Sequence, residues 1–116
     1  YARTKRMQVV LAGLLGQRLT PPGIWTASTH PGWAATPGVT DSLPGFAKFM
    51  RPLLRSPQQG ADTAIWLATS PEVLTQSGEF WHDRAIRPQH YLPYTKETAA
   101  QRECLWEYCV SQTASG

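Results

Sequence analysis

The tetrapeptide Thr-Pro-Pro-Gly at residues 20–23 constrains the fold most, because a helix cannot pass through it. Each proline removes a backbone donor, and the residue before a proline is pushed out of the helical region. Residues 1–18, ahead of this break, carry apolar side chains at helical spacing, whereas residues 24–29, after it, are mostly β-branched or aromatic. We therefore predict a helix over 1–18 and a buried strand over 24–29.

A second helix and a second strand are predicted further along the chain. Residues 56–59, Ser-Pro-Gln-Gln, have the form of a capping box with proline at the first helical position. The helix is predicted over 57–69, and its packing face is expected to consist of Ala61, Ala64, Ile65 and Ala68. A strand is predicted over 79–83. The helix between the two strands favours adjacent, parallel strands with a right-handed crossover.

The last predicted helix covers residues 95–111, with Thr95 as its N-cap. Its buried stripe is expected to contain Ala100, Cys104, Leu105, Tyr108 and Cys109. Neither cysteine has a histidine or a further cysteine at metal-ligand spacing, so both are expected to be buried thiols. His82 and His90 are likewise expected to be structural. Free thiols are typical of a reducing compartment, which predicts a cytoplasmic location.

Length and composition indicate at most one globular domain. The chain has 116 residues, of which 41% are hydrophobic and 16% charged. The net charge of +3 is scattered, with one tight cluster at Arg3, Lys5 and Arg6, so no nucleic-acid partner is predicted. No apolar run reaches the roughly 20 residues that a transmembrane helix needs. The chain is therefore predicted to be soluble.

Tyr1 and Lys5 form a candidate catalytic pair. Residues four apart on a helix share a face, with Cβ atoms roughly 6 Å apart. An ammonium group beside a phenol favours the phenolate, which makes tyrosine a usable general acid or base. The alternative is an ordinary pair of solvated neighbours, since Tyr-x-x-x-Lys alone is a weak motif.

Residues 30–37, His-Pro-Gly-Trp-Ala-Ala-Thr-Pro, follow the first predicted strand. Ligands of open α/β sheets bind beyond the carboxyl ends of the strands. Gly32 allows the backbone to approach a flat ring, Pro31 stiffens the turn, and Thr36 can hydrogen-bond a carboxamide. The alternative is an ordinary Pro-Gly turn.

Together these segments resemble the short-chain dehydrogenases/reductases, which are NAD(P)-dependent oxidoreductases with a Rossmann fold. The family's active-site Tyr-x-x-x-Lys is similar to Tyr1 and Lys5, and its Pro-Gly-x-x-x-Thr segment is similar to Pro31, Gly32 and Thr36. Residues 43–46, 60–63 and 78–84 resemble the family's member-twelve subgroup. The resemblance therefore covers nearly the whole chain.

The resemblance implies an α/β fold in which residues 1–116 form the C-terminal part of a single NAD(P)-binding Rossmann domain with a doubly wound parallel sheet. It implies that Tyr1 passes a proton to or from a carbonyl or alcohol substrate, and that Lys5 hydrogen-bonds the nicotinamide ribose. The nicotinamide of NAD or NADP is expected to contact Tyr1 and Lys5 and to rest on Pro31, Gly32, Ala34 and Thr36. No metal is expected.

The resemblance also implies an apolar substrate beneath a lid formed by residues after the nicotinamide segment. The candidate substrate contacts are Trp33, Phe46, Phe49 and Met50. The last three lie on one side of a short amphipathic piece that Pro52 ends, and simple packing on the core explains them equally well. Self-association through the helix over 1–18 is a further implication, because the family's corresponding helix often packs between subunits.

Several of the family's upstream motifs are absent from the 116 residues: the glycine-rich phosphate loop, the Asn-Asn-Ala-Gly segment and the catalytic serine. Gly13 and Gly16 do not replace the phosphate loop, because they lie inside an apolar helical stripe with no strand before it. We therefore predict the C-terminal part of a longer oxidoreductase, inactive by itself. The alternative is a non-catalytic truncated product that serves as an interaction or self-association module.

Overall fold

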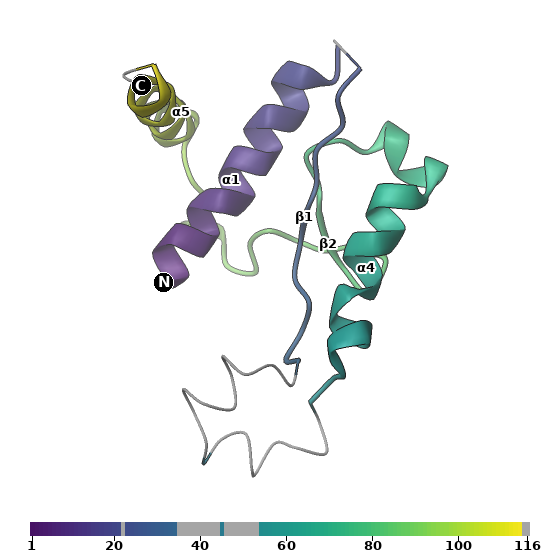
Figure 1. Ribbon diagram of the computed structural model, residues 1–116. Coiled ribbons are helices and arrows are strands. Elements are labelled where there is room, and N and C mark those ends of the chain that lie inside the picture. The colour runs from purple at the N-terminus through teal and green to yellow at the C-terminus, as the bar shows by residue number, and fades with distance from the viewer. Residues whose placement is uncertain (22, 35–44, 46–53, 115–116) are drawn as a thin grey trace.

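The computed structural model describes residues 1–21, 23–34, 45 and 54–114. Within these residues the elements are α1 (Ala2–Leu19), β1 (Ser28–Thr29), α4 (Pro57–Thr69), the 3-10 helix η2 (Pro71–Thr75), β2 (Phe80–His82), β3 (Ala85–Ile86), the 3-10 helix η3 (Pro93–Thr95) and α5 (Ala99–Thr113). α1 and α4 lie on opposite sides of the strands, and α5 lies beside α1 (Figure 1). The predicted α/β class is confirmed.

The first two predicted helices agree closely with the structure. α1 begins one residue later than predicted, with Tyr1 as its N-cap, and its buried residues include Val10 and Leu14 of the predicted stripe. α4 has the predicted bounds and the predicted capping box. The Gln59 N–H donates to Ser56 Oγ at 3.2 Å, and the Ser56 N–H donates to Gln59 Oε1 at 2.8 Å. Local signals were sufficient here because each contact spans only a few residues.

The buried face of α4 differs from the prediction. The expected packing residues are exposed: Ala61, Ala64, Ile65 and Ala68. The buried positions are Gly60 and Thr63. A Cβ on Gly60 would lie 3.1 Å from the Ala34 Cβ, and Trp66 packs edge-on against Trp81 with ring centroids 5.3 Å apart. The sheet side of α4 thus pairs a glycine that permits close approach with a large ring that fills the remaining space.

β1 and β2 are adjacent and parallel, as predicted, with Ser28 opposite Phe80. Only two residues of the first predicted strand belong to the ladder, and Ile24 and Trp25 are exposed, so a buried strand over 24–29 is wrong. The ladder does not extend toward Thr26 because the opposing chain is irregular there. Thr26 accepts from the Gly78 N–H at 2.7 Å, and Gly78 has a φ of +85°.

The sheet is mixed, because β3 pairs antiparallel with β2. The strand predicted over 79–83 ends at His82, and the chain then turns through Asp83 and Arg84, whose φ angles are +55° and +54°. Positive φ at both central residues is the geometry of a two-residue hairpin. This turn leads into β3, a strand that was not predicted from the sequence.

The last helix begins later than predicted, at Ala99. Its N-cap is Thr98, whose Oγ1 accepts from the Gln101 N–H at 3.2 Å, whereas Thr95 ends η3. Among residues 99–113 none is buried, and the side chain of Tyr108 is 59% exposed, so the predicted stripe is wrong. Cys104 is exposed and Cys109 half-buried, both as free thiols, so burial of both cysteines was also wrong.

Gly16 and Gly78 allow α1 to lie directly against the loop that precedes β2. A Cβ on Gly16 would lie 2.5 Å from the Gly78 Cα, which leaves no room for a side chain. Gly13 and Gly16 are both buried within α1, which confirms that they belong to a helical packing face. None of the helices in the described ranges is long and apolar enough to span a membrane.

Candidate functional site

The two segments predicted to form the site lie at the same end of the molecule. α1 runs away from this end, the chain reverses, and β1 returns toward it (Figure 1). The start of α1, with Tyr1 and Lys5, and the turn after β1 are therefore on the same side of the fold. Thr36, Phe46, Phe49 and Met50 lie outside the described residues.

Tyr1 presents its phenol to solvent at the start of α1. Its side chain is 94% exposed, and Lys5 Nζ lies 5.8 Å from the ring centroid. The Tyr1 carbonyl accepts from the Lys5 N–H at 3.0 Å and from the Thr4 hydroxyl at 2.7 Å, which fixes the first turn of the helix. A bound molecule could therefore reach a phenol that has an ammonium group close by.

The turn at residues 31–34 presents backbone and two exposed side chains, those of Pro31 and Trp33. Gly32 has a φ of +74°, a conformation that favours glycine, and its N–H donates to His30 Nδ1 at 2.9 Å. Ala34 is buried against α4. One end of the turn is thus anchored in the fold, while Pro31 and Trp33 are open to a ligand.

Arg55 packs against this turn, which sequence reasoning had not anticipated. A Cβ on Gly32 would lie 2.8 Å from Arg55 Nε, so the guanidinium occupies the space that any side chain at 32 would need. The Arg55 N–H donates to the Trp33 carbonyl at 2.8 Å. The sequence had explained Gly32 by the approach of a flat ring, whereas the contact seen in the structure is with Arg55.

Asp83 receives the other side of the Arg55 guanidinium. Both carboxylate oxygens accept from Arg55, with Nη2 to Oδ2 at 2.8 Å. This hydrogen bonding lowers the pKa of Asp83 to about 2, so the pair is charged at neutral pH. Partial burial, together with His82 and Arg55, lowers the pKa of His30, which keeps Nδ1 available as an acceptor. The His30 and His82 rings lie edge to face, 5.7 Å apart.

A second arginine–aspartate pair, Arg84 with Asp62, joins the turn between β2 and β3 to α4. Arg84 donates to Asp62 through Nε at 2.8 Å and Nη2 at 2.5 Å, and its backbone N–H donates to Thr63 Oγ1 at 3.3 Å. An open pocket of about 540 Å³ lies between the two pairs and is lined by Arg55, Gln58, Gln59, Asp62 and Asp83. The sequence contained a clue to this contact between Arg84 and Asp62. It joins residues 60–63 to residues 78–84, and both segments carry the subgroup resemblance.

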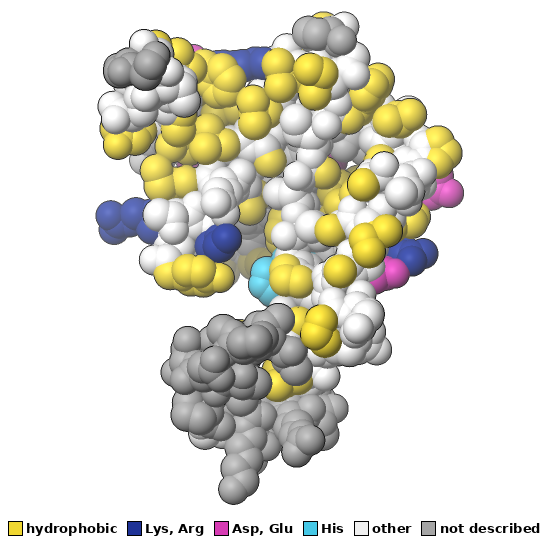
Figure 2. All heavy atoms as spheres, in the orientation of Figure 1, with side chains coloured by type: hydrophobic (Ala, Val, Ile, Leu, Met, Phe, Trp, Pro, Cys, Tyr) yellow, Lys and Arg dark blue, Asp and Glu magenta, His cyan; other side chains and the backbone are white. Residues whose placement is uncertain are grey.

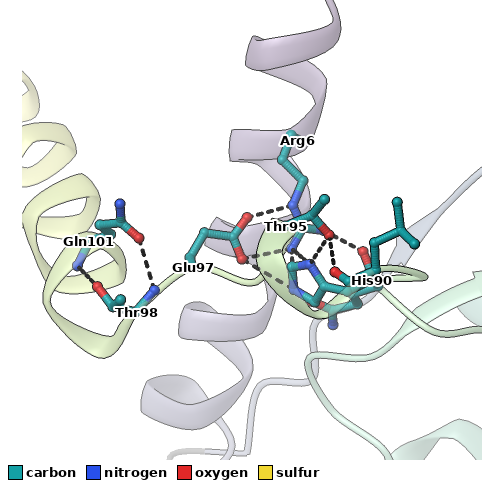
Figure 3. A network of polar contacts seen from close by, with 8 residues as sticks. Arg6, His90, Thr95, Glu97, Thr98 and Gln101 are labelled. Atoms are coloured by element: carbon teal, nitrogen blue, oxygen red, sulfur yellow. Dashed lines mark hydrogen bonds and ion pairs between the residues drawn. The ribbon is translucent and has the colours of Figure 1, made fainter.

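A further polar network joins α1 to the segment before α5 (Figure 3). Arg6 donates to both oxygens of Glu97, with Nε to Oε1 at 2.6 Å and Nη2 to Oε2 at 2.7 Å. His90 Nε2 lies 3.2 Å from Glu97 Oε2. The hydrogen bonds from Arg6 lower the pKa of Glu97. Within the described ranges no cluster of His, Cys, Asp and Glu could hold a metal ion.

Comparison with known proteins decides the family. The chain is 44% identical over 109 residues to dehydrogenase/reductase SDR family member 12 of Bos taurus, an alignment that covers 92% of this chain and 34% of that protein. It is also 44% identical to the protein of the same name from Homo sapiens, over 89% of this chain and 32% of that protein. The chain belongs to the short-chain dehydrogenase/reductase family.

More distant relatives agree with this assignment. Retinol dehydrogenase 14 of Homo sapiens is 29% identical over 113 residues, covering 92% of this chain and 33% of that protein. This short-chain dehydrogenase/reductase sequence thus spans about a third of the length of the curated relatives it matches. No family model and no solved structure matches it. The oxidoreductase family predicted from the sequence is confirmed.

Proposed function

We propose that this chain is the C-terminal part of an NAD(P)-dependent oxidoreductase, called the parent protein below, that interconverts a carbonyl and an alcohol. One observation supports the proposal: the start of α1, which carries the Tyr1–Lys5 pair, and the turn that follows β1 lie at the same end of the fold (Figure 1). The names of the relatives, which include a dehydrogenase/reductase and a retinol dehydrogenase, support the reaction class.

A nicotinamide would approach the exposed side of the turn, which Pro31 and Trp33 present, because Arg55 fills the space beside Gly32. When bound, the nicotinamide supplies a hydride to the carbonyl carbon or takes one from the alcohol carbon. Tyr1 Oη donates a proton to the substrate oxygen during reduction and accepts it during oxidation. The Lys5 ammonium stabilises the charge left on Tyr1 Oη and hydrogen-bonds the ribose.

The remaining proposed contacts hold the reactants. The nicotinamide rests on Pro31, Gly32, Ala34 and Thr36. An apolar substrate contacts Trp33, Phe46, Phe49 and Met50. The sequence of this chain leaves the choice between NAD and NADP open, because no residue in it is proposed to contact the adenosine ribose.

The domain around the site is proposed to be a doubly wound, Rossmann-like one of which residues 1–116 are a part. β1 lies at one edge of the sheet in the described residues, because the strand order is β1-β2-β3. We expect another parallel strand of the parent protein to pair with this edge. Helices on both sides of the strands support this architecture.

The reaction class is tested by carbonyl-dependent oxidation of NADH or NADPH in the purified parent protein, using a panel of apolar ketones and aldehydes. We expect turnover with at least one coenzyme. The 116-residue chain alone should neither bind the coenzyme tightly nor turn over, because it lacks the glycine-rich turn that binds a pyrophosphate. Saturable micromolar binding of NADPH to the chain alone would contradict this expectation, because it would show that these 116 residues contain the cofactor site.

An interaction or self-association module is the second candidate. Hydrophobic side chains cover much of the visible face over α5, α1 and the outer side of α4 (Figure 2). The exposed hydrophobic residues of α4 and α5 include Ile65, Tyr108 and Val110. This candidate predicts that the chain alone forms concentration-dependent oligomers in sedimentation velocity, and it makes no demand on turnover by the parent protein.

A further inference from the structure

We infer that Arg55 is a positioning residue that fastens the Pro31–Ala34 turn to the β2–β3 hairpin through Asp83. The inference extends the proposed function, because it concerns the turn that is proposed to seat the nicotinamide. Three contacts of Arg55 support it. The backbone of Arg55 bonds to Trp33, its guanidinium packs against Gly32, and the same guanidinium forms an ion pair with Asp83.

The backbone contact sets the spacing between the turn and α4. The Arg55 N–H donates to the Trp33 carbonyl at 2.8 Å, and Arg55 forms an isolated parallel bridge with Ala34. Ser56, the next residue, caps α4. The turn and the start of α4 are therefore joined through the backbone of Arg55.

The guanidinium contact sets the conformation of the turn. The site of a Cβ on Gly32 would be 2.8 Å from Arg55 Nε and 3.0 Å from Arg55 Cδ and Cζ. The planar group thus lies directly against the backbone of a residue with φ of +74°. Glycine reaches this conformation without a steric cost but leaves the turn free to adopt others, and the packed Arg55 side chain restricts that choice.

The ion pair fixes the guanidinium itself. Asp83 accepts from both terminal nitrogens of Arg55, a bidentate geometry that lysine cannot reproduce. Asp83 is in turn held at the first central position of the hairpin between β2 and β3. The chain of contacts runs from the hairpin through Asp83 and Arg55 to the Gly32 backbone.

This arrangement controls geometry more than overall stability. The side chains of Arg55 and Asp83 are 32% and 45% exposed, and exposed ion pairs add little to the free energy of unfolding. The Arg84–Asp62 pair offers a matched control. It is also bidentate and exposed, and Arg84 lies next to Asp83 in the same hairpin turn. In the described part of the chain, the hydrogen bonds of Arg84 go to Asp62 and Thr63 and none reaches the Pro31–Ala34 turn.

The first arm of the test measures hydrogen exchange at single amides of the parent protein. In Asp83→Asn we expect the amides of Gly32 and Arg55 to exchange at least about tenfold faster than in the wild type, as local opening becomes easier. In Asp62→Asn their exchange should stay at the wild-type rate. Unchanged exchange in Asp83→Asn, or an equal acceleration in Asp62→Asn, would overturn the inference.

The second arm separates kcat from coenzyme binding. Because the turn is proposed to contact only the nicotinamide end of the coenzyme, Arg55→Met should lower kcat about tenfold or more while changing the coenzyme Kd less than about threefold. Arg55→Lys should recover only part of the loss. If exchange accelerates but kcat is unchanged, Arg55 holds the turn without positioning reactants. A wild-type parent with no turnover removes the proposed function, and the exchange arm still decides whether Arg55 fastens the turn.

Discussion

Two networks of the molecule are each built on an arginine–carboxylate ion pair, but they connect different parts of the fold. Arg6 binds Glu97, a residue 91 positions later, and so joins the first helix to the segment that leads into the last (Figure 3). Arg55 binds Asp83 and contacts a backbone turn. The Arg6–Glu97 side chains are 29% and 21% exposed, whereas those of Arg55–Asp83 are 32% and 45% exposed.

From this difference we expect burial and neighbours to decide the role of each ion pair. Glu97 sits among partners that include His90, and removing its charge would leave Arg6 partly buried without its bidentate acceptor. Asp83 is accessible to water, which would replace most of its electrostatic contribution. We therefore expect the Arg6 network to act mainly on stability and the Arg55 network mainly on the geometry of the proposed site.

The largest expected effect on stability comes from Glu97→Gln. The amide keeps the shape of the side chain but removes its charge and replaces one acceptor oxygen with a donor nitrogen, so one of the two hydrogen bonds from Arg6 is lost. This change should cost about 1–3 kcal/mol of unfolding free energy. Urea denaturation of the parent protein, followed by circular dichroism, measures the change.

The matched control is Glu103→Gln. Glu103 also pairs with an arginine of α1, Arg18, at 2.6 Å, but its side chain is 50% exposed. Its loss should cost less than about 1 kcal/mol. Equal losses in the two variants would remove burial as the explanation of the difference.

The next effect is a difference in pH response between the two networks. Partial burial, His82 and Arg55 lower the pKa of His30, so its contribution to stability is present above the ordinary value of 6.5 and is lost as the pH falls through the folded-state pKa. The Arg6 hydrogen bonds lower the pKa of Glu97, so that contribution is lost only below its ordinary value of 4.5.

On acidification the Gly32 amide should therefore lose protection before the contacts of Arg6 do, because protonation of His30 Nδ1 removes its acceptor. Exchange of the Gly32 and Glu97 amides, followed from neutral pH to pH 4.5, checks the order. Simultaneous loss at both places would indicate global unfolding in place of two separate titrations.

The smallest expected effect is on the melting temperature of the exposed pairs. Asp83→Asn and Asp62→Asn should each leave Tm without a measurable change, because water solvates these carboxylates well. Differential scanning calorimetry is sufficient to check this. A drop in Asp83→Asn as large as that in Glu97→Gln would mean that the turn network also supports the global fold.

Sequence reasoning was most accurate where the determining contacts are local. The capping box at Ser56 and Gln59 and the break after Leu19 depend only on neighbouring residues. The helix ends predicted from them lie within one residue of the observed ends. The start of α5 was predictable by the same rule. Thr98 has glutamine three residues later, which Thr95 does not, yet Thr95 was preferred.

Predictions that depended on packing partners were less accurate. Which side of α4 faces the sheet depends on Trp81, far along the chain, so residue size alone gave the wrong face. For the candidate site, Tyr1, Lys5 and the Pro31–Gly32 turn could be proposed from motifs and family resemblance, and their roles stay predictions. Arg55 could not be found in this way, because Asp83 lies 28 positions away.

The central claim is that Tyr1 transfers the proton in the parent protein, and Tyr1→Phe tests it most directly. The variant removes one hydroxyl and little binding surface, with Tyr91→Phe as a control at another exposed tyrosine. We predict that Tyr1→Phe lowers kcat about 10²–10⁴-fold. Coenzyme affinity should stay nearly unchanged, and Tyr91→Phe should turn over like the wild type. Retention of most of the wild-type turnover by Tyr1→Phe would contradict the account.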